Sequence, residues 1–90
     1  MTSLERLMRL EIEFHRRLRT QVSGTMDAGA LHTSYALQCG YDSLIRTTGT
    51  VNVRDIDLLA DRLAPAVDAR DLAAARDSLK RLLGIPRASP

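Results

Sequence analysis

The sequence predicts an all-α fold, a small bundle of about four helices that form two helical hairpins around a charge-poor second helix. In four successive segments, apolar residues recur at the three- and four-residue spacing of an amphipathic helix. Breaks that contain glycine or proline separate these segments. Only one Phe and two Tyr are present, so Leu, Ile, Val and Ala must build the core, a composition that suits helices.

The length of 90 residues predicts one helical domain over residues 1–84 and a flexible tail over 85–90. A domain of this size buries only about 60–65% of its unfolded surface, which favours self-association. The single cysteine, Cys39, excludes an internal disulfide, and no apolar N-terminal run precedes a cleavage site, so we expect a cytoplasmic protein. No apolar run approaches the roughly 20 residues that span a bilayer, so we expect no membrane contact.

The first helix is expected to begin at Thr2-Ser-Leu-Glu5, which has the form of a capping box. Apolar residues occupy one arc of its wheel, and Glu11 projects from the middle of that arc. His15 follows four residues later on the same side and is placed to pair with Glu11. The apolar arc consists of Leu4, Leu7, Met8, Phe14, Leu18 and Val22.

Three interpretations of the Glu11 and His15 pair stay open. The pair forms a structural ion pair or hydrogen bond near Tyr35 or Tyr41, or it sets the register of a protein interface, or it serves a metal or acid–base site. Two His and one Cys supply few metal ligands, and Glu-x-x-x-His matches no mechanistic signature. We therefore predict no catalytic residue, no metal and no cofactor.

The opposite face of the first helix is rich in arginine. All of the net charge of +2 falls within residues 1–23, which hold five Arg and three Glu. Carboxylates interrupt this face and favour i,i+4 pairs of Glu5 with Arg9 and Glu13 with Arg17 over phosphate contacts. The candidate nucleic-acid residues on this face are Arg6, Arg9, Arg16 and Arg17.

The second helix is expected from Ala28 to about Thr47, after a turn at residues 23–27. From Ala28 to Ile45 it carries one formal charge, Asp42, which predicts burial on most sides. A row of small residues predicts a closely approaching helix, and Gly40 in particular indicates backbone proximity or a kink. This row consists of Thr33, Ala36, Gly40, Ser43 and Thr47.

Two shorter helices complete the prediction. Asn52 is the expected N-cap of a helix over 53–63, which Pro65 ends, while Val51 and Val53 give only weak evidence for a strand. Asp68 opens the last helix, which Gly84 and Pro86 stop. The inner stripe of the last helix consists of Leu72, Ala75, Leu79, Leu82 and Leu83.

These surfaces predict a small non-catalytic regulatory, adaptor or chaperone-like protein that acts through helix-mediated protein contacts as a homo-oligomer. The alternative is a nucleic-acid-binding regulator that uses the Arg-rich face, because the last helix has Asp68 and Asp71 where a recognition helix needs positive charge. No phosphate loop or nucleophile elbow points to an enzyme or to a small-molecule substrate. The predicted protein-interface residues are Glu11, His15, Ala36, Gly40 and Tyr41.

Overall fold

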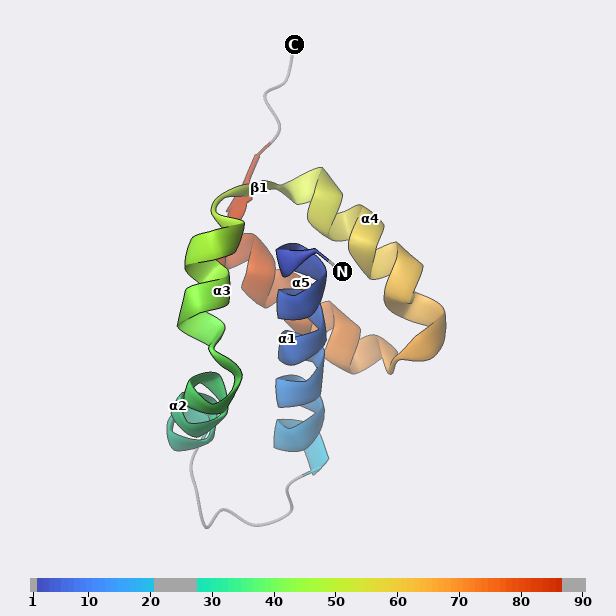
Figure 1. The fold of residues 1–90 in the computed structure, drawn as a ribbon. Helices are drawn as coiled ribbons and strands as arrows, with labels where there is room; N and C mark the ends of the chain where they lie inside the picture. Colours follow the sequence, from blue (N-terminus) through green and yellow to red (C-terminus); the bar gives the residue numbers. More distant parts are fainter. Residues whose placement is uncertain (1, 21–27, 87–90) are drawn as a thin grey trace.

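The computed structural model describes residues 2–20 and 28–86, without the side chains of 28–31, 34 and 35, and it confirms the all-α class. Within these residues the helices are α1 (Ser3–Thr20), α2 (Ala28–Cys39), α3 (Tyr41–Thr48), α4 (Val53–Leu63) and α5 (Ala69–Leu82), with a 3-10 turn η1 (Ala64–Ala66) between the last two. The predicted turn at 23–27 lies outside the described residues. Figure 1 shows α1 between the α2–α3 side and α4, with α5 crossing behind it.

The central element is α1, not the charge-poor second helix of the prediction. α1 contacts α2, α3, α4 and α5. Among the described side chains of α2, Ala36 and Cys39 are half-buried and Leu37 is exposed. A helix becomes central when an apolar stripe faces the core, and α2 lacks charge without having such a stripe. Its low charge therefore did not indicate burial.

Gly40 divides the predicted second helix into α2 and α3. It adopts the left-handed conformation with φ 65° and ψ 36°, which residues with a side chain rarely take. Among the described residues, no atom beyond its two chain neighbours lies within 4 Å of the position that a Cβ would occupy there. Of the two predicted roles for Gly40, the structure bears out the kink and contradicts the close approach of another helix within the chain.

The caps that the sequence predicts for the other helices are confirmed. Thr2 Oγ1 accepts a hydrogen bond from Glu5 N at 3.1 Å. Asn52 Oδ1 accepts one from Arg54 N at 2.8 Å, and Asp68 Oδ1 accepts one from Arg70 N, also at 2.8 Å. These side chains satisfy amide groups that have no partner within their own helices, so α4 and α5 begin one residue after their caps.

A short parallel strand pair joins the start of α4 to the end of α5. β1 (Val51–Asn52) pairs with β2 (Gly84–Ile85) in the register Val51 to Gly84 and Asn52 to Ile85. Gly84 is required by a close approach rather than by a left-handed cap, since a Cβ there would lie 2.7 Å from Lys80 O. Residues 87–90 of the predicted tail lie outside the described residues.

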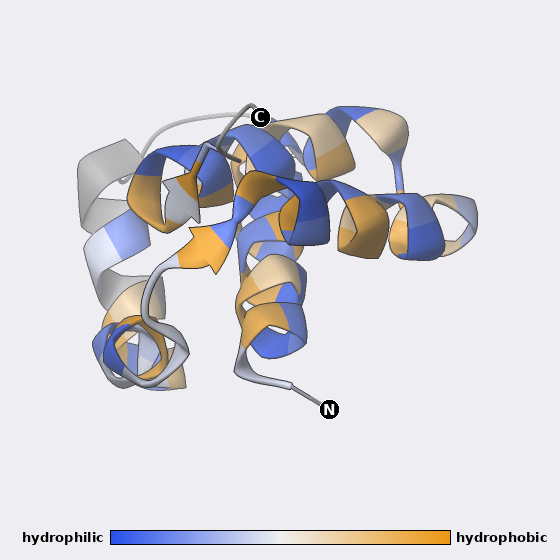
Figure 2. Cartoon of the chain, turned by 90° about the horizontal axis from the view of Figure 1, so that it is seen from above, coloured by the Kyte–Doolittle hydropathy of each residue, from blue (hydrophilic) through white to orange (hydrophobic). Residues whose placement is uncertain are grey.

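The core lies between α1, α4 and α5 and is closed by α3. Figure 2 shows apolar and polar residues alternating along these helices, as expected for amphipathic elements. In the described part of the chain, no helix is long and apolar enough to cross a membrane. The buried apolar residues are Leu7, Met8, Ile12, Phe14, Tyr41, Ile56, Leu59, Ala60, Leu63, Leu72, Ala75, Leu79 and Leu83.

Replacing Gly40 tests whether the break between α2 and α3 is built into the backbone. We expect Gly40→Ala to lower the free energy of unfolding by about 1 kcal/mol, because alanine disfavours the left-handed conformation. Gly40→Asn should cost less, since asparagine tolerates that conformation better. Urea unfolding followed by circular dichroism measures both variants. An alanine variant as stable as the parent protein would contradict the expectation.

Candidate functional site

The most unusual polar residue of the fold is Glu11, which lies in the middle of α1 and is only 3% exposed. The Tyr41 hydroxyl donates a hydrogen bond to Glu11 Oε1. His15 Nε2 lies 3.3 Å from Glu11 Oε2. The predicted pairing of Glu11 with His15, with Tyr41 nearby, is therefore present, and both carboxylate oxygens have a partner.

Local structure explains how these groups meet. Glu11 and His15 are four residues apart on one helix and lie on the same face. Tyr41 is the first residue of α3, directly after the left-handed turn at Gly40, and its ring is buried. Burial and the adjacent Glu11 carboxylate raise the pKa of Tyr41 above its ordinary value, so its hydroxyl remains a donor.

The contacts extend from this pair to the surface of α5. His15 Nε2 also lies 3.3 Å from Ser78 Oγ, and Arg81 Nη2 donates to the same oxygen at 3.4 Å. We call the connected set Tyr41, Glu11, His15, Ser78 and Arg81 the polar network. It joins α3, α1 and α5: Tyr41 contacts the Glu11 carboxylate directly, and Ser78 of α5 is linked to it through His15.

Aromatic rings surround the polar network. The Phe14 ring lies edge-on to His15 at 5.2 Å and to His32 at 5.0 Å between ring centroids. His32 in turn lies 5.6 Å from the Tyr41 ring. These T-shaped contacts hold α2 against α1 and α3 through His32, which the sequence analysis did not assign to any site.

The geometry of His15 argues against a Ser-His-Glu catalytic relay. Such a relay uses one imidazole nitrogen for the acid and the other for the serine. Here a single nitrogen, Nε2, faces both Glu11 and Ser78.

An open hollow of about 350 Å³ adjoins these side chains and is lined by Glu11, Phe14, His15, His32, Ser78, Arg81 and Leu82.

The described residues contain no group of three or more His, Cys, Asp or Glu side chains arranged to hold a metal ion. Glu11 and His15 are satisfied by each other and by neighbouring hydroxyls, which favours the structural interpretation of this pair.

The predicted protein-interface residues do not form one surface. Glu11 and Tyr41 are buried and contact each other inside the fold. His15 and Ala36 are half-buried, and Ala36 packs against the core. Gly40 alone of the five is exposed. Gly40 is therefore accessible from outside, whereas Glu11 and Tyr41 contact each other between α1 and α3.

The Arg-rich face of α1 is partly neutralised by its own carboxylates. Arg16 binds Glu13 through two hydrogen bonds of 2.9 and 2.6 Å, and Arg17 Nε donates to Glu13 at 3.0 Å. The hydrogen bond from Arg16 is the largest cause that lowers the pKa of Glu13 to about 2. Arg9 Nε lies 3.5 Å from Glu5, as the i,i+4 spacing predicts.

Arg6 is the one nucleic-acid candidate without an ion pair in residues 2–20 and 28–86. Together with Arg9 it borders an open hollow that is otherwise lined by Leu10, Cys39 and Leu44. A single unpaired guanidinium beside apolar side chains provides little of the positive charge that a phosphate backbone requires. The four arginines share one face of α1, but they do not form a continuous cationic stripe.

Sequence reasoning missed the pair of Arg19 and Asp71. Arg19 Nε and Nη2 donate to the two Asp71 oxygens at 3.0 and 2.9 Å, which ties the end of α1 to the start of α5. Asp71 is only 3% exposed. The signal was present, because Asp71 precedes Ala75 by four residues and therefore belongs to the inner stripe of α5.

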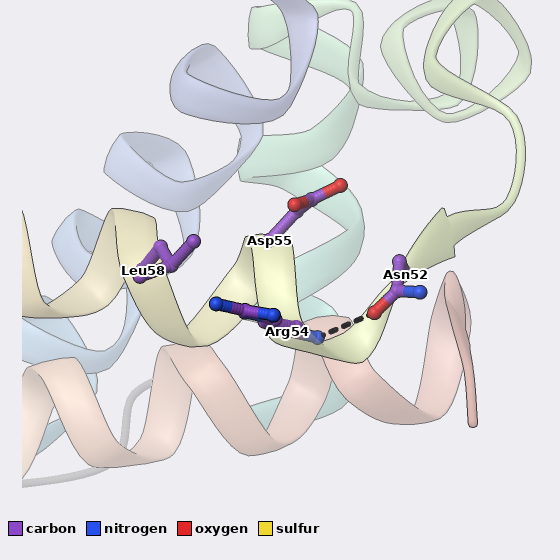
Figure 3. A pocket seen from close by; sticks show the side chains of 4 residues that line it. All are labelled: Asn52, Arg54, Asp55 and Leu58. Atoms are coloured by element: carbon purple, nitrogen blue, oxygen red, sulfur yellow. Dashed lines mark hydrogen bonds between the residues drawn. The ribbon is translucent and has the colours of Figure 1, made fainter. Parts of the chain in front are cut away.

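A second missed feature is the outer face of α4. Its first turns border an open hollow of about 350 Å³ lined by Asn52, Arg54, Asp55 and Leu58, as Figure 3 shows. Leu58 is 55% exposed. A neighbouring hollow, also of about 350 Å³, lies on the α1 side of Leu58 and is lined by Thr2, Leu4, Asp55, Leu58, Leu59 and Arg62.

Comparison of the chain with protein-family models, curated proteins and solved structures gives no match. Any assignment of function therefore depends on the residues and surfaces described above.

Replacing Tyr41 tests how strongly the Glu11 contact holds α3. We expect Tyr41→Phe to lower the free energy of unfolding by about 1–3 kcal/mol, because one oxygen of a buried carboxylate loses its donor. In a Glu11→Leu background the same replacement should cost much less, since no carboxylate remains. A double-mutant cycle from urea unfolding measures the coupling. Equal costs in both backgrounds would contradict the contact.

Replacing Asp71 tests the tie between α1 and α5. The Arg19 guanidinium lowers the pKa of Asp71 below its ordinary value of 3.8, so folding favours the ionised carboxylate. The resulting stability is complete above the unfolded pKa and is lost as the pH falls through the folded pKa. We expect Asp71→Asn to be less stable at pH 7 and to lose less of its remaining stability below pH about 4. Thermal unfolding from pH 7 to pH 2 measures both effects, and parallel pH curves would contradict them.

Proposed function

We propose that this chain is a small non-catalytic regulatory, adaptor or chaperone-like protein that acts through helix-mediated contacts with other proteins and as a homo-oligomer. The observation that carries the proposal is the exposed apolar surface of α2. This helix has no charged residue from Ala28 to Cys39, and its Leu37 is 78% exposed. Leu37 is the most exposed large apolar side chain in the described part of the chain.

The position of α2 supports contact with a helix from a partner. Burying an exposed leucine stabilises a complex by about 1.5–3 kcal/mol, before the costs of association. Exposed Gly40 and Thr33 are small and lie near Leu37 in the sequence, so the backbone of an incoming amphipathic helix can approach. We also place the protein in the cytoplasm, because Cys39 has no second cysteine with which to pair.

Two observations argue against the competing functions, which are an enzyme and a nucleic-acid-binding protein. The polar network satisfies its own buried groups and uses one His15 nitrogen twice, so it offers no free base to a substrate. The Arg-rich face directs three of its four candidate arginines toward Glu5 and Glu13. Nucleic-acid binding by this face would compete with those ion pairs and would show steep salt dependence.

A charge placed on α2 tests the proposal. We expect Leu37→Glu to remove the partners that the parent protein captures by cross-linking from its native cytoplasm, because the carboxylate would be buried at the contact. Leu82→Glu on α5 is the matched control, since Leu82 is also exposed, at 55%. Mass spectrometry identifies the captured proteins, and circular dichroism checks that both variants fold.

The result expected is a defined set of proteins held by the parent and by Leu82→Glu but lost from Leu37→Glu. Identical sets for all three proteins would contradict the role of α2. Capture of nucleic acid alone, released by moderate salt, would replace the proposal with the Arg-rich alternative.

A further inference from the structure

The outer face of α4 has a symmetric pattern of charge about one exposed leucine. Relative to Leu58, positions −4 and +4 are basic and positions −3 and +3 are acidic. Spacings of three and four residues place all of these side chains on one helix face. All five are exposed, and we call them the α4 face: Arg54, Asp55, Leu58, Asp61 and Arg62.

Most charges of the α4 face have no ion-pair partner among the described residues. In the ranges 2–20 and 28–86, no ion pair engages Arg54, Asp55 or Asp61, while Arg62 binds Glu5. By contrast, Asp57 on the inner side of the helix is held by Lys80 at 2.7 Å. The charges of Arg54, Asp55 and Asp61 are therefore available to another molecule, whereas Arg62 is shared with Glu5.

The exposed Leu58 side chain lies beside two hollows on the surface of α4. Its side chain lines the hollow toward Asn52 (Figure 3) and also the hollow toward Leu4. A leucine that stands beside a hollow can enter the equivalent hollow of an identical molecule. In a two-fold contact, the leucine of each copy enters the hollow of the other, so both copies make the same interaction.

We propose that a second copy of this chain docks on the α4 face, with the two α4 helices antiparallel and each Leu58 seated in a hollow beside the Leu58 of the other copy. The inference rests on the homo-oligomer of the proposed function and assigns the surface that forms it.

The helical wheel shows why the charges fit. With about 100° per residue, Arg54 and Asp61 lie on one side of Leu58, and Asp55 and Arg62 lie on the other. In an antiparallel pair related by a two-fold axis, each side of α4 lies next to the same side of α4 in the second copy. Arg54 then meets Asp61 of the second copy, and Asp55 meets Arg62 of the second copy. Each opposite-charge contact occurs twice.

This pattern favours a second copy over other occupants. Two acids and two bases leave the α4 face without net charge, so it does not attract phosphate. The four charges are arranged around Leu58 so that the α4 face is complementary to itself, as an isologous contact requires. A partner of different sequence would have to carry the same arrangement of charges.

Sedimentation velocity over a concentration series tests the dimer, with four variants. Leu58→Glu should weaken association more than about tenfold, because it places two carboxylates at the centre of the contact. Leu82→Glu is equally exposed in the parent, at 55%, and should leave association within about twofold. Asp61→Arg should weaken association by opposing Arg54 of the second copy. The double variant Arg54→Asp with Asp61→Arg should restore it, since the pair is only reversed.

A parent protein that stays monomeric at every concentration would overturn the proposal. So would equal weakening by Leu58→Glu and Leu82→Glu, or a double variant that associates no better than Asp61→Arg alone. These failures differ from failure of the proposed function. A monomeric parent that still loses its captured partners through Leu37→Glu overturns the α4 dimer and leaves the α2 contact standing.

Discussion

The fold depends on how the carboxylate of Glu11 is held inside it. A carboxyl group removed from water is costly unless its oxygens have polar partners, and here the partners come from α1 itself and from α3. The Tyr41 hydroxyl donates to one oxygen from the start of α3, and His15 of α1, which is itself in contact with Ser78 of α5, lies beside the other oxygen. Hydrogen bonds are directional, whereas the burial of apolar surface is not. The polar network therefore favours one orientation of α3 and α5 against α1.

Two further ties complete the arrangement at the ends of the helices. The Arg19 and Asp71 pair closes α1 onto the N-terminus of α5, and the β1–β2 pairing closes the start of α4 onto the end of α5. α5 is thus held in three places. Asp71 in its first turn contacts α1, Ser78 near its end also contacts α1, and the strand β2 that follows it pairs with β1. A chain with few aromatic residues gains orientation from these directional contacts, while Leu, Ile and Ala supply the area that is removed from water.

Local signals in the sequence predicted much of this fold. Asn52, Asp68 and Thr2 were identified as caps because capping depends on residues two or three positions away. The pairing of Glu11 with His15 was local for the same reason. Ser78 and the partner of Asp71 could not be predicted, because they meet α1 only after the chain has folded back. The break at Gly40 was one of two predicted roles, and low charge in the second helix was misread as burial.

The polar groups described above form their hydrogen bonds within the chain, and this affects which side chains can contact other molecules. Because the polar network and the α1 carboxylates form their hydrogen bonds and ion pairs within the chain, the two proposed contacts use other side chains. In the described residues they include Leu37 on α2, and Leu58 on α4 together with the unpaired Arg54, Asp55 and Asp61. Figure 1 places α2 and α4 on opposite sides of α1. A second copy on α4 would therefore leave α2 open, so self-association and partner binding need not compete.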